Sequence, residues 1–243
     1  MAVQINVYER GAPVIAPRNT AQAINEVGVR GIPGHLIFDV LAEHGSGPGK
    51  GQALWKGVAR STGALVAFCD ADVRDFDERF ATGLVGPLLL DPGASFVKAY
   101  YQRPGDGHPR GVGRVTELVA RPALHLLFPE LADVVQPLSG EFAGRRALLE
   151  SLPFVEGYGV DLGLLVDVWR AVGRDGIVQV DLGSRIHRNR PLDELGPMAT
   201  VVLQTALRRA GVDAPATVVL ERPDAEAVTV AFAERPPLAS LQG

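Results

Sequence analysis

Two aspartates at the end of an apolar run are the residues of this sequence best placed to do chemistry. Asp70 and Asp72 follow Phe68 and Cys69, and a single alanine separates them. Side chains two residues apart project to the same side of an extended chain, so both carboxylates would leave the strand together. Such a pair suits a hard divalent cation that holds phosphate oxygens. For an isolated pair, a strand that stops at a solvated acidic turn is the favoured alternative, so other residues must decide.

A glycine-rich loop before this strand is a candidate phosphate site. It spans residues 45–51, reads Gly-Ser-Gly-Pro-Gly-Lys-Gly, and places Lys50 just before a predicted helix. Backbone amides at a helix N-terminus, together with an ammonium group, attract anions. The loop is not the P-loop of nucleotide hydrolases, because His44 stands where that motif needs its first glycine, and Gly51 where it needs Ser or Thr. A flexible connector would explain the same composition.

A second glycine-rich turn opens a predicted helix with Gly113, Arg114 and Thr116. Backbone amides, a guanidinium and a hydroxyl suit a small phosphorylated or carboxylated molecule, since arginine can pair with two oxygens at once. A plain helix cap is the alternative.

A histidine and a further aspartate follow later in the chain. His187 lies in a basic loop, and if it meets Asp72 at one sheet edge the two form a mixed imidazole and carboxylate site, typical of Mn²⁺ or a tolerant Mg²⁺ site. A lone histidine is more often structural. Asp161 stands just before a predicted helix, where its simplest role is that of an N-cap.

Composition limits the classes of function. The 243 residues are 47% hydrophobic and 21% charged, with a formal net charge of −4, so no overall basic field exists for nucleic acid or an anionic membrane. Arg188 and Arg190 form too small a basic cluster for a nucleic-acid module. The single cysteine, Cys69, excludes an intrachain disulfide and is expected in the core. Without a signal peptide or an apolar run of membrane length, we expect a soluble cytoplasmic protein.

The apolar spacing predicts alternating helices and strands. Helices are predicted over residues 52–60, 116–127, 162–172 and 195–210, and strands over 64–70, 96–101 and 176–182. This alternation implies an α/β fold whose mainly parallel sheet is flanked by helices on both faces. Residues 1–41 hold neither a helical nor a strand period for long, and they are expected to be weakly structured. The proline-rich tail from Pro223 is expected to lie over the surface.

Several blocks of sequence occur in a recognisable order. They are residues 48–55, 70–72, 113–122, 136–141, 152–154, 157–160 and 187–195. Together they closely resemble the glucosyl-3-phosphoglycerate synthases, retaining glycosyltransferases with the GT-A fold, over Asp39 to Gly211. The resemblance implies a GT-A-like (Rossmann-like) domain over residues 39–243 with a C-terminal acceptor-binding and helical part. Residues 1–38 would be an atypical segment that lacks the family's usual first βαβ unit and its uridine-binding motifs, through a shifted reading frame, a wrong start, a truncated gene or a diverged domain.

The resemblance also implies a reaction. Glucose would pass from a nucleotide diphosphate sugar, usually UDP-glucose, to the 2-hydroxyl of 3-phosphoglycerate, with retention at the anomeric carbon through front-face attack. Asp72 and His187 would bind Mg²⁺ or Mn²⁺, with Lys50 and Asp70 close to the nucleotide. Asp161 stands where the family commonly has glutamate, so its carboxylate would position donor or acceptor as a catalytic residue. Acceptor binding would fall to Gly113, Arg114, Thr116 and Asn189.

The family commonly forms dimers, so a homodimer is expected. Two alternatives stay open at this point. One is a related transferase that uses GDP-mannose or ADP-glucose. The other is a truncated, catalytically impaired homologue that binds phosphoglycerate or a partner subunit.

Overall fold

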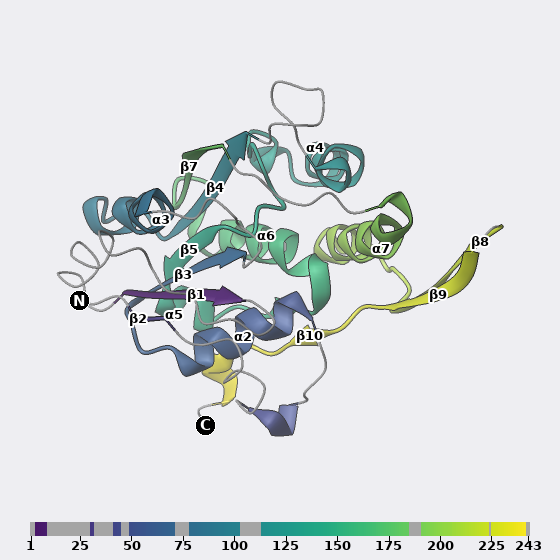
Figure 1. The fold of residues 1–243 in the computed structure, drawn as a ribbon, viewed down its shortest axis with the longest axis horizontal. Coiled ribbons are helices and arrows are strands. Elements are labelled where there is room, and N and C mark those ends of the chain that lie inside the picture. The colour runs from purple at the N-terminus through teal and green to yellow at the C-terminus, as the bar shows by residue number, and fades with distance from the viewer. Residues whose placement is uncertain are drawn as a thin grey trace.

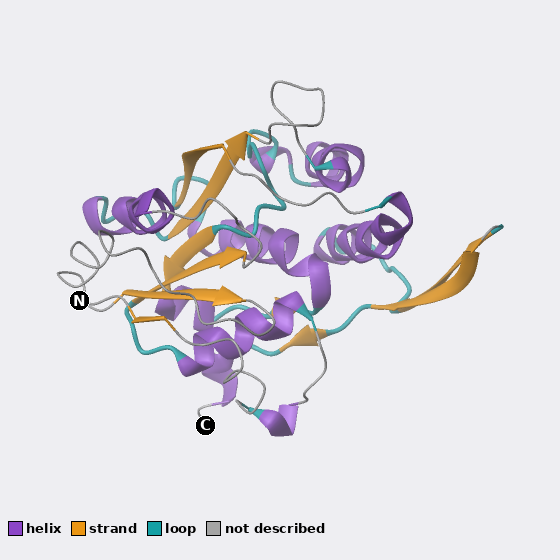
Figure 2. Ribbon diagram, in the orientation of Figure 1, coloured by secondary structure: helices purple, strands orange, loops and turns teal. Residues whose placement is uncertain are grey.

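A central six-stranded sheet with helices on both faces organises the chain (Figures 1 and 2). The structure, a computed structural model, describes residues 3–8, 30–31, 41–44, 49–70, 78–102, 113–184, 191–223 and 225–241. Three of the predicted site residues, Asp72, His187 and Asn189, lie outside these ranges. The described part therefore tests the surroundings of the predicted metal site rather than its ligands.

The sheet is mainly parallel, as the sequence predicts. Its strands, in spatial order, are β2 (Arg30–Gly31), β1 (Val3–Tyr8), β3 (Leu65–Asp70), β5 (Phe142–Arg145), β4 (Phe96–Gln102) and β7 (Ile177–Ser184). Strand β5 is antiparallel to both of its neighbours, β3 and β4, whereas the other strand pairs are parallel. The chain thus enters β5 at the edge of the sheet where β3 and β4 end. Residues just before Phe142 therefore lie beside the end of β3, where Asp70 is found.

The N-terminal part contributes strands to this sheet. Strand β1 pairs with β3 from Val3 opposite Leu65 to Tyr8 opposite Asp70, and β2 pairs with β1. The structure differs here from the expected weak structure, because residues 3–8 alternate apolar and polar side chains over a length that suffices for one strand. The connection between β1 and β2 and the chain after β2 lie outside the described ranges. The missing βαβ unit and the domain boundary after residue 38 therefore stay predictions.

The predicted helices are confirmed, with starts shifted by a few residues. They are α2 (Lys50–Arg60), a π-helical stretch (Thr116–Ala120) continued by α4 (Arg121–Leu127), α6 (Val160–Val172) and α7 (Leu192–Arg209). Gly211, with a φ of 77°, follows α7 in the left-handed conformation that glycine adopts without strain. The sequence pattern did not predict two further helices, α3 (Glu78–Leu90) and the short α5 (Arg146–Glu150). Helix α3 contains Pro87, which obscures its period.

Alternation along the strands divides the core into two clusters, one on each face of the sheet. On β3, Leu65, Ala67 and Cys69 pack with Phe80 and its neighbours from α3. Val66 and Phe68 face the other cluster, which includes residues of α2 and α6. Because successive side chains alternate, Asp70 continues the face of Val66 and Phe68 and so lies on the side of α2 and α6. Cys69 is 1% exposed, which confirms its expected place in the core.

The same alternation applies to β4 and has a less expected result. Val97, Ala99 and Tyr101 pack on the α3 side, and Phe96 packs on the opposite side. Lys98 therefore points to the same face as Asp70, into the larger cluster of apolar side chains. A lysine at this position needs polar partners, because a buried ammonium without them is costly.

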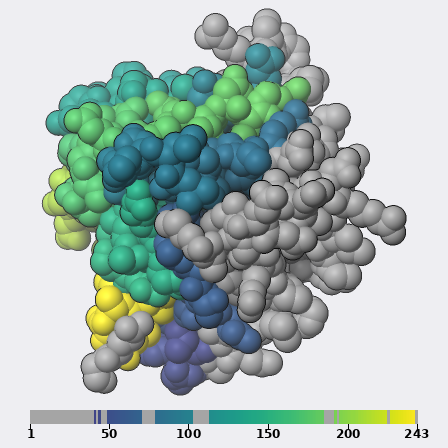
Figure 3. Space-filling model, turned by 90° about the vertical axis from the view of Figure 1, so that its left-hand side faces the viewer, coloured from purple at the N-terminus to yellow at the C-terminus, as the bar shows by residue number. Residues whose placement is uncertain are grey.

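The C-terminal residues do more than cover the surface. Strands β8 (Thr217–Arg222) and β9 (Ala225–Ala231) form a hairpin that projects from the body (Figure 1), whereas β10 (Glu234–Arg235) pairs with β6 (Phe154–Val155). Beyond β10, the indole of Trp55 in α2 donates a hydrogen bond to the carbonyl of Pro236 at 2.8 Å, and Leu238 is 5% exposed. Figure 3 shows yellow C-terminal atoms beside purple atoms from the early part of the chain, and Arg235 donates a hydrogen bond to the carbonyl of His44. The expectation of a surface tail is thus corrected, because Leu238 joins the core.

Candidate active site

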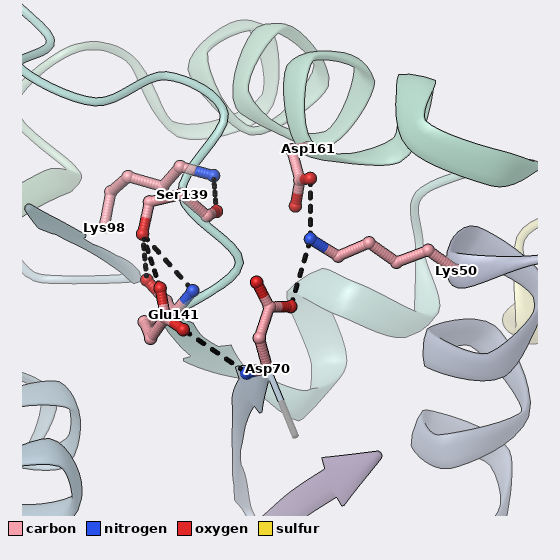
Figure 4. A network of polar contacts seen from close by, with 6 residues as sticks. All are labelled: Lys50, Asp70, Lys98, Ser139, Glu141 and Asp161. Carbon is pink, nitrogen blue, oxygen red and sulfur yellow. Dashed lines mark hydrogen bonds and ion pairs between the residues drawn. The ribbon is translucent and has the colours of Figure 1, made fainter. Parts of the chain in front are cut away.

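Lys50, the first residue of α2, lies between two carboxylates (Figure 4). Its Nζ is 2.8 Å from Oδ2 of Asp161 and 3.3 Å from Oδ1 of Asp70. The side chain of Lys50 is 19% exposed and that of Asp161 only 4%, so the pair between them is largely shielded from water. Helix α2, the end of β3 and the first turn of α6 meet at this ammonium group, so the structure brings Lys50, Asp70 and Asp161 together.

The glycines around Lys50 allow α2 to approach β6 closely. A Cβ atom on Gly51 would overlap the carbonyl oxygen of Val155, because the two atoms would lie much closer than van der Waals contact. Gly49 precedes the helix and also lies close to the backbone of Gly157. These residues set where α2 begins, and hence where Lys50 points. The glycine-rich sequence of this loop thus has a packing reason at residues 49 and 51.

Asp161 lies within α6 rather than before it. The helix begins at Val160, and its N-cap, Gly159, makes no side-chain capping bond. The alternative interpretation of Asp161 as an N-cap is therefore wrong, because the helix starts two residues earlier than predicted. Its carboxylate instead binds Lys50 through Oδ2, while Oδ1 is buried without a hydrogen-bond donor among the described residues. An acceptor left in this state is suited to a hydroxyl group of a ligand.

The backbone and the carboxylate of Asp70 both contact the turn that leads into β5. Its backbone N–H donates to Oε1 of Glu141 at 3.4 Å, a long hydrogen bond. A Cβ atom on Gly140 would overlap both carboxylate oxygens of Asp70. The Asp70 carboxylate therefore lies directly against the backbone of residue 140, and only glycine leaves room for it.

A second buried lysine, Lys98, donates a hydrogen bond to this turn. Nζ of Lys98 donates to the carbonyl of Ser139 at 2.8 Å, and the Ser139 hydroxyl donates to Oε2 of Glu141 at 3.1 Å. Lys98 is 2% exposed, Ser139 1% and Glu141 fully buried. Figure 4 shows these three residues on one side of Asp70 and Lys50 on the other.

Burial and charge shift the pKa values of this network in opposite directions. Burial alone would lower the pKa of Lys50, but the charges of Asp161 and Asp70 outweigh it and hold that pKa above its ordinary value. Burial raises the pKa of Asp161, against the charges of both lysines. Burial also lowers the pKa of Lys98 to about 8, although the charge of Asp161 opposes this shift. Lys50 thus stays charged at neutral pH, whereas Lys98 titrates close to it.

This lowered pKa predicts a pH dependence of stability. Between pH 8 and 10.5 the folded chain binds fewer protons at Lys98 than the unfolded chain, so the cost of its buried charge is relieved and stability rises with pH through that window. The charged groups that act on it are Asp161, Lys50, Glu141 and Asp70. We expect the free energy of unfolding of the wild type, minus that of Lys98→Met, to rise from about pH 8 to 10.5. Urea titrations at a series of pH values measure it, and a constant difference would contradict the shift.

The network carries more negative than positive charge when all its groups are ionised. Asp70, Glu141 and Asp161 bring three carboxylates, and Lys50 and Lys98 bring two ammonium groups, so the sum is −3 + 2 = −1 when all are ionised. Within the described ranges, no group of three His, Cys, Asp or Glu residues is placed to hold a metal ion. The predicted ligands, Asp72 and His187, lie beyond those ranges. Carboxylate oxygen and imidazole nitrogen nevertheless match what Mn²⁺ and Mg²⁺ accept, and the excess of carboxylates favours a cation nearby.

Three of the four predicted acceptor residues, Gly113, Arg114 and Thr116, lie at the start of a different helix. The carbonyl of Gly113 accepts the hydrogen bond of the Glu117 N–H at 3.0 Å, Arg114 is exposed, and Thr116 is 6% exposed. The π-helical stretch that follows packs against α7. Arg114 thus lies on the surface at the start of this helix, and its part in acceptor binding stays a prediction.

Sequence reasoning missed Lys98, Ser139 and Glu141 as site residues. Glu141 lay inside a recognised block without a role, and Lys98 carried one signal, a lone lysine in an apolar strand. The turn before β5 lay in the same block, also without a role. Its importance depends on β5 lying between β3 and β4, which the sequence did not indicate.

A mainly parallel α/β sheet, with a lysine and carboxylates gathered where its strand β3 ends, defines a GT-A glycosyltransferase. Comparisons agree. Over 99% of its length the chain superimposes on crystal structures of glucosyl-3-phosphoglycerate synthase from Mycobacterium tuberculosis. The complex with phosphoglyceric acid gives a TM-score of 0.81 at 36% identity, with 91% of that chain covered. The complex with Mn²⁺, UDP-glucose and phosphoglyceric acid gives 0.80 at 38%, with 90% covered.

Sequence relatives lead to the same family. The chain is 48% identical to the glucosyl-3-phosphoglycerate synthase of Mycolicibacterium smegmatis and 46% identical to that of Mycolicibacterium paratuberculosis, over 80% of its own length in each case. These alignments span 68% and 64% of the two relatives. No protein-family model matches the sequence. The chain belongs to the glucosyl-3-phosphoglycerate synthase family, which confirms the resemblance, the GT-A fold class and the assignment to a family of hexosyltransferases.

Proposed function

We propose that this chain transfers glucose from UDP-glucose to the 2-hydroxyl of 3-phosphoglycerate with retention. Its relatives are named glucosyl-3-phosphoglycerate synthases, and the resemblance to that family implies the donor, the hydroxyl and the stereochemistry. The observation that carries the proposal is the position of Lys50 between Asp70 and Asp161 at the end of β3. A related enzyme has been crystallised with Mn²⁺, UDP-glucose and phosphoglyceric acid together. A charged lysine at the same edge as an acidic motif is what a diphosphate leaving group requires.

In the proposed reaction, the bond from the anomeric carbon to the diphosphate oxygen breaks, and a bond to the acceptor's 2-hydroxyl oxygen forms on the same face. The leaving phosphate accepts the hydroxyl proton. Lys50 keeps its charge at neutral pH, so it stabilises the negative charge that develops on the leaving diphosphate. Asp161 presents its unpartnered Oδ1 to a hydroxyl of donor or acceptor and thereby orients it.

Asp72 and His187 would hold the divalent cation, Mg²⁺ or Mn²⁺, as oxygen and nitrogen ligands. When bound, the ion neutralises charge on the diphosphate. Asp70 precedes Asp72 by two residues. Its carboxylate is held by the ion pair with Lys50 and by contact with the backbone of Gly140, so the first residue of the acidic motif has a fixed position. That anchoring supports a metal site whose first ligand, Asp72, follows Asp70 closely in the sequence.

For the acceptor, we propose Gly113, Arg114, Thr116 and Asn189 as the residues that bind its phosphate and carboxylate. Support comes from the exposed guanidinium of Arg114 at the start of a helix. Arginine pairs with two oxygens of one anion at once, and the N-terminal end of a helix favours negative charge.

The direct test of this function is release of UDP from UDP-glucose, 3-phosphoglycerate and Mg²⁺. We expect Asp72→Ala to lower the rate at least about 100-fold, since the cation contributes several kcal/mol to the leaving group. Asp213→Ala, at an exposed position after α7, serves as the matched control and should retain the wild-type rate.

The donor and the activity can be separated in the same experiment. Release from GDP-mannose or ADP-glucose, but not from UDP-glucose, would replace the proposed donor. If the wild type turns over no nucleotide sugar but binds phosphoglycerate in calorimetry, it is a catalytically impaired homologue.

We further propose that the chain forms a homodimer. The β8–β9 hairpin projects from the body (Figure 1), and Val219 on it is 54% exposed. A projecting two-stranded hairpin is marginally stable alone and gains by packing against a second surface. We expect light scattering after size exclusion to give about twice the chain mass of 25.8 kDa, and Val219→Asp to shift it toward the single chain. A wild type that runs at the mass of one chain would reject this proposal.

A cytoplasmic location is the final part of the proposal. It is supported by the chain's single cysteine, which is buried. Among the helices that the structure describes, none has the length and apolar character to cross a bilayer. Fractionation of cells that produce the protein measures where it resides.

A further inference from the structure

Lys98 occupies a position where an apolar side chain would be expected. It lies in the middle of β4, is 2% exposed, and has the ring of Phe142 5.3 Å from its Nζ. In the sheet register it stands opposite Phe142 on one side and Gln179 on the other. An ammonium group in such a place costs several kcal/mol unless polar partners compensate, so its presence needs a reason beyond core packing.

The partners of Lys98 form a path that leads to Asp70. Nζ donates to the Ser139 carbonyl at 2.8 Å, and the Ser139 hydroxyl donates to Oε2 of Glu141 at 3.1 Å. The other oxygen of Glu141 accepts from the backbone N–H of Asp70. The hydroxyl of Ser139 also accepts from the Glu141 N–H at 3.3 Å, which closes the turn on itself.

The same turn contains Gly140, whose backbone lies against the Asp70 carboxylate. A shift of this turn would therefore move both the backbone and the carboxylate of Asp70. Lys98 holds this turn through a charge-assisted hydrogen bond to the carbonyl of Ser139, the residue that immediately precedes Gly140. The turn is thus held at Ser139 by Lys98, and at Glu141 by its hydrogen bond with the Asp70 N–H.

We propose that Lys98 is a positioning residue of the transferase, which holds the 139–141 turn and through it the geometry of Asp70 at the nucleotide end of the site. This inference rests on the proposed function, and it adds a residue that does not touch substrate. Partners that orient the groups around a metal commonly contribute about 10- to 100-fold to metal affinity.

The first measurement is calorimetric binding of UDP with and without Mn²⁺. For Lys98→Met we expect the Mn²⁺-dependent gain in UDP affinity to fall about 10- to 100-fold, while the affinity for 3-phosphoglycerate stays at the wild-type value. Lys56→Met is the matched control, because Lys56 is equally buried at 2% but lies further along α2. It should retain the gain even if it lowers stability. A Lys98→Met protein that gains as much from Mn²⁺ as the wild type overturns the inference.

A second measurement needs no ligand. Hydrogen exchange of the backbone amides of Asp70 and Glu141, whose acceptors belong to the network, should accelerate in Lys98→Met and not in Lys56→Met. If Lys98→Met does not fold, Ser139→Ala removes the middle link with a smaller change in volume, and the same loss of Mn²⁺-dependent gain is expected. If the wild type itself shows no Mn²⁺-dependent UDP binding, the proposed function fails. The exchange rates then decide alone, and unchanged rates at both amides refute the positioning role.

Discussion

Replacing Lys50 with methionine is expected to reduce UDP release at least about 100-fold, because it removes the charge that we propose stabilises the leaving diphosphate. It should also lower the free energy of unfolding by about 3–5 kcal/mol, since Asp161 is left buried without its cation. The side chain of Asp161 is 4% exposed, so water cannot replace the lost ammonium. Steady-state rates and urea unfolding measure the two effects separately.

A double variant distinguishes loss of charge from loss of structure. In Lys50→Met with Asp161→Leu, no buried carboxylate lacks its partner at position 161, so most of the stability should return while UDP affinity does not. UDP affinity that recovers together with stability would mean that Lys50 acts only through the fold. Normal Mn²⁺-dependent UDP binding by Lys50→Met would likewise remove it from the nucleotide site.

Gly140→Ala is expected to lower the turnover rate about 100-fold, because displacement of a reacting group by about 1 Å is enough for such a loss. The added Cβ would overlap both carboxylate oxygens of Asp70, so the carboxylate must leave Lys50 or the turn must shift. Gly140 is not among the glycines with positive φ, so alanine meets no backbone strain there. The effect should therefore appear in rate and Mn²⁺ dependence more than in the melting temperature.

Gly86→Ala in α3 is the matched control. A Cβ at that position would have no atom within 4 Å, so the variant should keep the wild-type rate and gain slightly in helix stability. If Gly140→Ala also keeps the wild-type rate, the Asp70 carboxylate does not need its observed position for catalysis.

The sequence predicted those elements whose period is unbroken. The strand ending at Asp70 and the helices around Trp55 and Trp169 show their apolar spacing openly, and the structure differs from the prediction by only a few residues at their ends. Helix α3 was missed because Gly83, Gly86 and Pro87 interrupt its pattern. Strand β5 was missed because it is four residues long and directly precedes a helix.

The candidate site was predicted only in part, for a related reason. Lys50, Asp70 and Asp161 each border an element that the sequence shows, but their roles came from the family resemblance, which placed Lys50 and Asp70 near the nucleotide and gave Asp161 a separate role. Glu141 becomes a site residue only because β5 inserts between β3 and β4, which is a property of the sheet and not of any local window. Lys98 is recognised by its contacts, since a lysine in a strand is more often directed to solvent.

The contact between Trp55 and Pro236 has a consequence for how the chain folds during synthesis. Helix α2, which carries Lys50, emerges early from the ribosome, but the carbonyl that binds its indole is made 181 residues later. Arg235, which pairs with Gln52 and Glu156, arrives equally late. Because domains fold from the N-terminal side as they emerge, α2 must wait without its final partners until Pro236 has been made. The position of Lys50 is therefore fixed late in folding, and Arg235 and Pro236 act as the late anchor of its helix.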